Sequence, residues 1–210
     1  MKIAQVVCVF PPYKGGIGNV AWQYARRLSD RGETVFVFVP GRGKTKIEDA
    51  QEGLVIFRLR SLIKFGHAAF LPQLFCMLRD FEVVHLHYPA YGLSEAVCLL
   101  KLFKIKKMKL IVTYHMDTVG NGWKGVIFKI YKKLAMPIIL ASADAVLCSS
   151  FDYMLNSDAK NIFLRHRSKF YGLPFGVDEK FIPKLKDKSW QEKIGVKILY
   201  REKKLERVLS

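Results

Sequence analysis

The sequence predicts an α/β protein with a single doubly wound parallel sheet and a helical C-terminal tail. Short, continuous apolar runs recur along the chain, as expected of strands that are covered on both faces. Segments with helical periodicity separate these runs, and their spacing suits right-handed crossover connections. Residues 181–210 differ, because they are rich in Lys and Glu and contain no further strand–loop–helix unit.

The first strand is expected at Ile3–Phe10, followed by a loop at Pro11–Gly18 and a helix at Val20–Arg31. Asn19 is the candidate N-cap of this helix, and Gly32 is its candidate C-terminal stop. Residues 42–51 are expected to form a polar loop. The other expected strands are Thr34–Val39, Leu54–Leu59, Val83–His87, Lys109–Tyr114, Ala145–Cys148 and Phe170–Pro174. The other expected helices are His67–Arg79, Ala90–Phe103, Lys124–Leu134 and Asp152–Arg165.

The composition is that of a globular protein. With 210 residues, of which 50% are hydrophobic, the chain is long enough to bury a core and is not wholly disordered. No apolar run approaches the roughly 20 residues of a membrane-spanning helix. The longest candidate, Met136–Cys148, is interrupted by Pro137 and Asp144. The 4 cysteines are far apart and form no CxxC pair, which favours reduced thiols in the cytoplasm and no metal site.

The formal net charge of +17 predicts an anionic partner. Residues 101–140 carry 9 basic and 1 acidic side chains. Within the helix expected at Lys124–Leu134, an apolar stripe fits either a core helix with a solvated lysine face or an interfacial helix. No nucleic-acid-binding module is present, so we favour an anionic membrane surface. The residues expected at this surface are Lys104, Lys106, Lys107, Trp123, Lys124, Lys129, Lys132 and Lys133.

The glycine-rich loop before the first helix predicts a phosphate site. Gly15, Gly16 and Gly18 allow close backbone approach, and the start of the helix offers free N–H groups and a partial positive charge. The spacing also resembles a dinucleotide fingerprint, but the loop is too long and the second strand lacks the acidic residue that binds ribose. Arg42 leaves an NADP-dependent oxidoreductase as an alternative, and a loop that only makes the turn is another.

Histidines lie at the ends of two neighbouring strands. The alternation of side chains along a strand places His85 and His87 on one face, as in polar strand ends and in some metal sites. His115 closes the fifth strand, and Asp117 follows it. At the ligand-binding edge of a sheet, His115 is a candidate to donate hydrogen bonds or to transfer a proton.

Five segments in order resemble the GT4-type, retaining glycosyltransferases of the GT-B fold: PPYKGGIGNVAWQYARRLSDRGETVFVF, VVHLHYP, TYHMD, ADAVLCSS and LPFGVDEKFIP. The resemblance covers about residues 1–183. It implies an N-terminal, Rossmann-like domain that binds the acceptor, while a second domain binds the nucleotide sugar. It places Gly15 and Gly16 near the donor diphosphate and His115 near the transferred sugar, with Asp117 less securely placed. We expect Gly18, in the same loop, to belong to the diphosphate site as well. The acceptor cleft is expected to include Tyr13, Lys14, His87 and Tyr88.

We therefore expect an acceptor-binding domain at residues 1–178, the N-terminal half of a GT-B fold. Residues 179–210 are expected to form a linker and a Lys/Glu-rich helical tail, and the donor-binding domain is expected to be absent. The expected activity moves a sugar from a nucleotide sugar, as co-substrate, to a membrane-linked glycan or lipid at the inner face of the membrane. It would need no cofactor or metal, but would need a donor-binding domain or a separate donor-binding chain. A non-catalytic protein that docks on membranes or partners is the alternative from another class.

Overall fold

The computed structural model describes residues 1–13, 15–66, 68–103 and 108–176. The chain divides into two units, Met1–Phe175 and Gly176–Ser210, and the fold below is that of the first. The expected tail at 179–210 and the side chains of Lys14, Lys104, Lys106 and Lys107 lie outside the described residues.

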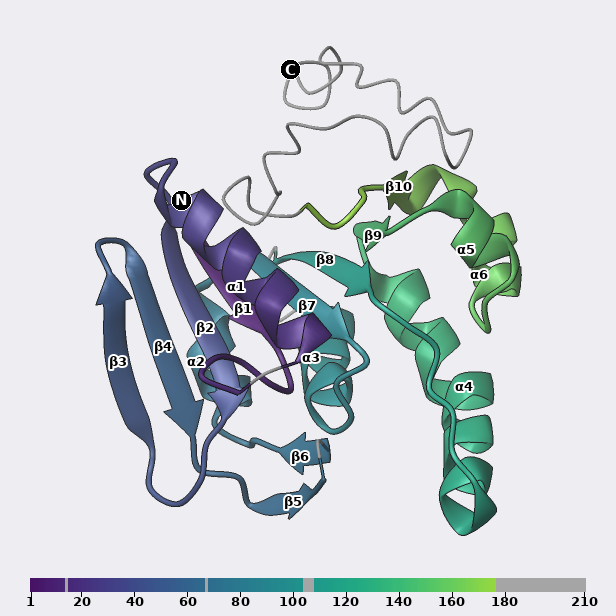
Figure 1. Cartoon of the computed structure of the whole chain (residues 1–210), viewed down its shortest axis with the longest axis horizontal. Helices are drawn as coiled ribbons and strands as arrows, with labels where there is room; N and C mark the ends of the chain where they lie inside the picture. Colours follow the sequence, from purple (N-terminus) through teal and green to yellow (C-terminus); the bar gives the residue numbers. More distant parts are fainter. Residues whose placement is uncertain (14, 67, 104–107, 177–210) are drawn as a thin grey trace, which may run out of the picture. The chain divides into compact units, whose positions relative to one another are not determined.

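An 8-stranded sheet in the order β10-β9-β8-β7-β1-β2-β4-β3 forms the centre of this unit (Figure 1). Its neighbouring strands run parallel, except β3, which is antiparallel to β4. This arrangement confirms the predicted doubly wound sheet. Its strands are β1 (Lys2–Val6), β2 (Thr34–Pro40), β3 (Lys46–Gln51), β4 (Leu54–Leu59), β7 (Val83–Tyr88), β8 (Lys109–Tyr114), β9 (Ala145–Cys148) and β10 (Phe170–Gly172).

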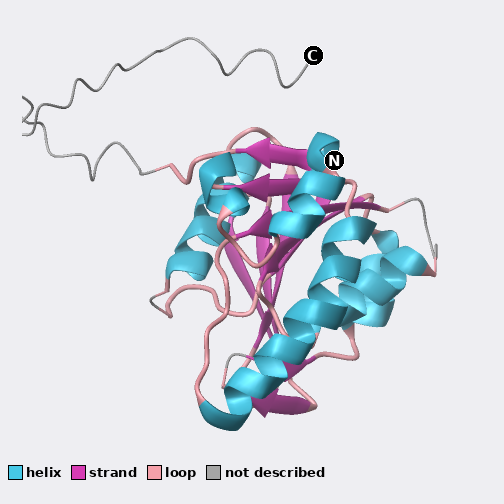
Figure 2. Cartoon of the chain, turned by 90° about the vertical axis from the view of Figure 1, so that its right-hand side faces the viewer, coloured by secondary structure: helices cyan, strands magenta, loops and turns pink. Residues whose placement is uncertain are grey.

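Helices cover both faces of the sheet (Figure 2). On one face, α1 packs against β2 and β4 through the small side chains Ala21 and Ala25. The larger core, on the other side, includes side chains from α3, β7, β8 and α4. The described helices are α1 (Gly16–Ser29), α2 (Leu74–Met77), α3 (Leu93–Leu102), α4 (Gly122–Ser142), α5 (Phe151–Leu155) and α6 (Lys160–Arg165), with 3-10 turns at Leu78–Asp80 and Arg167–Lys169.

The register brings the carboxyl ends of β1, β7 and β8 to one edge. Val6 pairs with Leu86, and His87 pairs with Thr113. In open parallel sheets this edge is where ligands bind. The segments that follow these three strands therefore form the candidate site.

The start of the chain differs from the prediction in two places. β1 ends at Val6 rather than Phe10, although Val7 and Phe10 remain buried in the loop. α1 begins at Gly16, so Asn19 is not its N-cap; the N-cap is Gly15, with an extended backbone, and the Asn19 N–H donates to its carbonyl. Within the first turn of α1, only Gly18 lies too close to another segment for a side chain, because its Cβ would meet the backbone of Val9.

Two segments with little apolar periodicity form strands that were not predicted. Within the expected loop 42–51, Lys46–Gln51 is an edge strand that pairs with β4 through its backbone. The expected helix His67–Arg79 was also wrong at its start. Ile63–Phe65 (β5) and Ala68–Phe70 (β6) form a hairpin, and the helical part begins only after Pro72.

Two helices also differ in extent. α4 runs to Ser142, well beyond the expected end at Leu134, because Pro137 removes only one hydrogen-bond donor and the helix continues past it. The helix expected at Asp152–Arg165 is two short helices, with Ser157 in the turn between them. Across the described ranges, no helix combines the length and the apolar character needed to cross a membrane.

Candidate functional site

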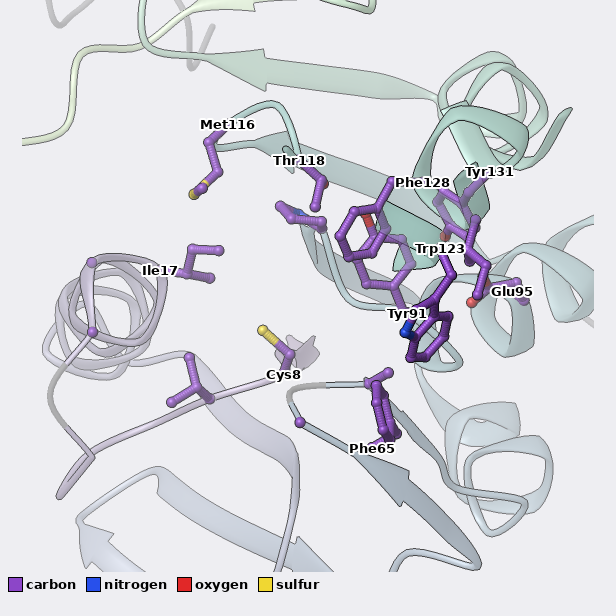
Figure 3. A pocket seen from close by; sticks show the side chains of 17 residues that line it. Cys8, Ile17, Phe65, Tyr91, Glu95, Met116, Thr118, Trp123, Phe128 and Tyr131 are labelled. Carbon is purple, nitrogen blue, oxygen red and sulfur yellow. The ribbon is translucent and has the colours of Figure 1, made fainter. Parts of the chain in front are cut away.

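A cavity of about 710 Å³ lies at the carboxyl edge of the sheet (Figure 3). Its walls come from the loop after β1, the first turn of α1, the β5–β6 hairpin, the segments after β7 and β8, and α4. Cys8 and Ile17 point into it from one side, and aromatic side chains of α4 and of the segment after β7 face them. The site therefore joins elements that are far apart in the sequence.

The first turn of α1 forms the wall best suited to an anion. Gly15 and Gly16 line the cavity, and a Cβ at Gly16 would meet no atom within 4 Å. No side chain caps the helix and no acidic residue lies in its first turn, so its N–H groups and positive end face the cavity without a built-in anion. Gly18 has a different role: its Cβ would lie 2.8 Å from the Val9 carbonyl oxygen, so it is there for packing.

A side chain of β4 anchors the loop that precedes α1. The Arg58 guanidinium donates a hydrogen bond to the Pro11 carbonyl oxygen at 2.5 Å and pairs with the Glu48 carboxylate at 2.8 Å. Tyr13 is exposed, and the guanidinium carbon of Arg42 lies 4.8 Å from its ring centroid. Tyr13, which we expected in the acceptor cleft, is not among the residues that line the cavity.

Beside the cavity lining, His85, His87 and His115 form a contiguous cluster. The rings of His85 and His87 are 4.3 Å apart, which confirms that both side chains are on one face of β7. His87 Nδ1 lies 2.9 Å from His115 Nε2, and His85 Nε2 lies 2.6 Å from the Thr113 hydroxyl. Tyr24 of α1 covers the first two rings, with centroid distances of 5.5 and 6.1 Å.

All three histidines are neutral near pH 7. Burial, together with the neighbouring His115, lowers the pKa of His85 to about 3. Burial and the other two histidines hold the pKa of His87 well below its ordinary value. Burial also lowers the pKa of His115 to about 4. A neutral imidazole donates from one nitrogen and accepts at the other, so each of the two hydrogen bonds, His85–Thr113 and His87–His115, has one defined direction.

The direction of the hydrogen bond between His87 and His115 follows from the other nitrogen of His87. Its Nε2 is buried and has no hydrogen-bond partner among the described residues. We assign the proton to Nδ1, because a buried N–H without an acceptor is the rarer and costlier arrangement. His87 then donates to His115 Nε2, and His115 carries its own proton on Nδ1. In this tautomer, His115 is a neutral hydrogen-bond donor, and its ring stacks on Phe175 at 5.1 Å.

Asp117 is engaged with neighbouring segments. The Tyr114 hydroxyl donates to its carboxylate at 2.5 Å, and the Asp158 N–H donates to the same oxygen at 3.1 Å. Its own N–H donates to the Tyr153 hydroxyl. These bonds tie the loop after β8 to α5 and the turn that follows it, which is a structural role; its predicted chemical role remains a prediction.

His87 and Tyr88, expected in the acceptor cleft, are 0% and 1% exposed and do not line the cavity. Their place in the lining is taken by Pro89 and Tyr91, just beyond the strand end. The sequence reasoning also missed an aromatic wall. For four of its five members, the signal was the density of aromatic residues after the fourth and fifth expected strands; Phe65 comes from the hairpin before them. The members of this wall are Phe65, Tyr91, Trp123, Phe128 and Tyr131. No group of three or more side chains that could hold a metal ion occurs in the part of the chain that the structure describes.

The outer face of α4 is apolar and exposed. Ile127, Ile130 and Leu134, three of the four residues of the predicted stripe, are 50–61% exposed, so the interpretation as a core stripe is wrong for them. Trp123, Val126 and Ile138 extend this face, and we call these six residues the α4 apolar face. Lys129 and Lys133 are exposed on one flank. Lys132 lies on the opposite side, where its ammonium pairs with Asp158 at 2.5 Å.

Comparisons with known proteins agree with this architecture. The model of Glycosyltransferase Family 4 matches residues 14–153. Sucrose-phosphate synthase from Thermosynechococcus elongatus is similar in structure, with a TM-score of 0.57 and 16% identity, over 93% of this chain and 53% of that one. A partial structure of the same enzyme has a TM-score of 0.51 and 14% identity, over 87% of this chain and 93% of that one.

A second solved protein has the same fold. An α-glucosyltransferase in complex with UDP and a 13-mer DNA has a TM-score of 0.52 and 12% identity, over 85% of this chain and 43% of that one. The chain thus spans about half the length of the whole enzymes that it resembles. No curated protein matches its sequence.

Proposed function

The chain belongs to Glycosyltransferase Family 4, and we propose that it is the acceptor-binding half of a retaining hexosyltransferase. In this proposal, a second Rossmann-like domain binds the nucleotide sugar, either elsewhere in the same polypeptide or in a separate chain. Because the chain belongs to a glycosyltransferase family, we no longer propose an NADP-dependent oxidoreductase. The observation that carries the proposal is the cavity at the carboxyl edge, with the uncapped start of α1 in its wall.

The start of α1 suits the donor diphosphate. Gly15 and Gly16 leave the first N–H groups accessible, and these groups with the helix dipole stabilise a phosphate that gains charge as the sugar departs. Gly18 supports this arrangement indirectly, because only a residue without a side chain lets α1 start so close to Val9. The diphosphate itself would be delivered by the donor-binding domain.

His115 is proposed to orient the reacting sugar as a neutral hydrogen-bond donor. Its pKa of about 4 means that it carries no positive charge near pH 7, so it is not a cationic acid there. The bond from His87 holds the ring and the tautomer. We assign no protein nucleophile.

We further propose that α4 docks on the inner face of an anionic membrane. The α4 apolar face would enter the interface, and Lys129 and Lys133 would contact lipid phosphates. Each lysine near such a surface contributes about 1 kcal/mol. Lys132, also expected at this surface, pairs with Asp158, and the proposal does not depend on it. The side chains of Lys104, Lys106, Lys107 and Lys124 are expected to add to the charge.

Transfer is tested with labelled nucleotide sugars and a lipid extract, with and without the donor-binding domain of a family member. We expect labelled lipid only when both halves are present, and loss of label with His115→Ala. Clear transfer by this chain alone would contradict its assignment as a half. Membrane binding without transfer in either mixture would favour the non-catalytic docking protein.

Docking is tested by flotation with vesicles that contain anionic lipid. K129E/K133E should lower the bound fraction at least ten-fold. The matched control is K44E/K46E, which reverses two exposed charges near β3, at the far edge of the sheet. Equal loss in both double variants would show that net charge, rather than α4, determines binding.

A further inference from the structure

The lining of the cavity at the carboxyl edge is mostly apolar. Aromatic rings form one wall: Phe65 lies 5.9 Å from Trp123, and Tyr91 stacks on Phe128 at 5.3 Å. Cys8, Val9 and Ile17 line the side towards β1 and α1. These rings and side chains offer an apolar ligand extensive contact but few hydrogen bonds.

The polar side chains of the lining are few and partly occupied. Glu95 accepts a hydrogen bond from the Gly92 N–H at 2.7 Å, which closes the first turn of α3. The other polar side chains of the cavity lining are Thr118, Tyr91 and Tyr131. A handful of such groups suffices to orient one head group.

The cavity is continuous with the exposed apolar surface. Phe65, Trp123 and Ile127 line the cavity and are also 59%, 61% and 50% exposed, so they form its rim. Leu62 and Ile63, beside Phe65 in the hairpin, are exposed as well. An apolar chain can therefore pass from the α4 apolar face into the cavity without crossing a polar surface.

We propose that this cavity binds the acyl or prenyl chain of a lipid acceptor, with its head group towards Gly15 and Gly16. The inference rests on the proposed function and names its substrate class. A methylene group is about the size of a water molecule, which takes about 30 Å³ in the liquid, so 710 Å³ holds roughly 20 of them. A chain of the length found in membrane lipids therefore fits the cavity.

Trp123 reports on the occupant directly. In the W22F/W190F variant it is the remaining tryptophan, and 9,10-dibromostearic acid should quench its fluorescence while stearic acid does not. Ala68→Phe, which fills the cavity from β6, should weaken the apparent affinity at least ten-fold. The matched control is L134N/I138N, which alters the α4 apolar face outside the lining and should leave the affinity unchanged. The reverse pattern would place the chain on the surface of α4 and overturn the proposal.

A second measurement needs no substitution. Cys8 lines the cavity, whereas Cys76 is exposed elsewhere, so the two thiols serve as probe and internal reference. Stearic acid should slow the alkylation of Cys8 by N-ethylmaleimide at least five-fold and leave Cys76 unchanged, as followed by mass spectrometry. Equal rates at Cys8 with and without the fatty acid would show that the cavity stays empty.

These readouts separate this inference from the proposed function. Binding of stearic acid in the cavity, without transfer in the two-domain assay, would keep the lipid site and reject the glycosyltransferase role. Transfer to a water-soluble glycan, without protection of Cys8, would keep the glycosyltransferase role and reject the lipid chain.

Discussion

The neutral histidine cluster predicts that the protein loses stability in mild acid. In the unfolded chain, a histidine titrates near pH 6.5, whereas burial lowers the pKa of His85 to about 3 and that of His115 to about 4, and lowers that of His87 well below 6.5. Below pH 6.5 the unfolded state therefore binds more protons than the folded state, and stability falls as the pH falls. Between pH 7 and pH 5, each such histidine costs about 2 kcal/mol, and the three together cost roughly 6 kcal/mol. A domain of this size has roughly 5–15 kcal/mol to lose.

Urea unfolding followed by circular dichroism at pH 7, 6 and 5 measures this loss. His87→Gln keeps a side chain that can bond to His115 but removes one titrating group, so the loss should shrink from roughly 6 to roughly 4 kcal/mol. Tyr24→Phe is the matched control, because it changes the same cluster without removing a group that titrates between pH 5 and 7. The same pH dependence in the parent protein and in His87→Gln would refute the neutral cluster, and with it the role of His115 as a neutral donor.

Three further substitutions test how the site is built. Gly92→Ala should lower the free energy of unfolding by at least about 3 kcal/mol, because the φ of Gly92 is +82° and the new Cβ would lie 2.2 Å from the Ala69 carbonyl oxygen. Gly43→Ala is the control: its φ is +78° but its surroundings are open, so it should cost only about 1 kcal/mol. Thermal unfolding measures both. Asp117→Asn should retain most of the transfer activity, since an amide oxygen still accepts from Tyr114, whereas loss of activity at unchanged stability would reveal a chemical role for the carboxylate. Arg58→Met should speed amide hydrogen exchange at residues 13–16, because it removes the hydrogen bond to the Pro11 carbonyl oxygen. Unchanged exchange there would mean that Arg58 does not stabilise the loop.

The sequence predicted best the elements whose stability comes from burial. The strands Leu54–Leu59, Lys109–Tyr114 and Ala145–Cys148 are found at the expected residues, because each is an apolar run with polar residues around it. β3 and the β5–β6 hairpin were missed for the opposite reason. Their exposed residues are joined mainly by backbone hydrogen bonds, and these leave little trace in the order of side-chain types.

The same distinction separates the site features that the sequence predicted from those that it did not. The alternation along β7 placed His85 and His87 together, but the contact between His87 and His115 depends on the register of β7 against β8, which a single sequence does not report. The sequence located the glycine loop correctly. It could not distinguish the roles of Gly16 and Gly18, because these depend on where Val9 lies in the folded chain. The stripe on α4 was compatible with a core or an interface, and only its exposure distinguishes the two.

The way α4 is attached connects docking with acceptor entry. The first half of α4 is joined to the sheet through Tyr91, which stacks on Phe128 and meets Tyr131 edge-on at 4.5 Å, and these rings are also a wall of the cavity. A large apolar side chain gains about 1.5–3 kcal/mol when it is buried, and the α4 apolar face forgoes this gain within the folded chain. If the face recovers that free energy at a bilayer, the interface is anchored beside the rim formed by Trp123 and Ile127. A lipid chain leaving the bilayer then reaches the cavity without first being exposed to water, which is the costly step for a long apolar acceptor.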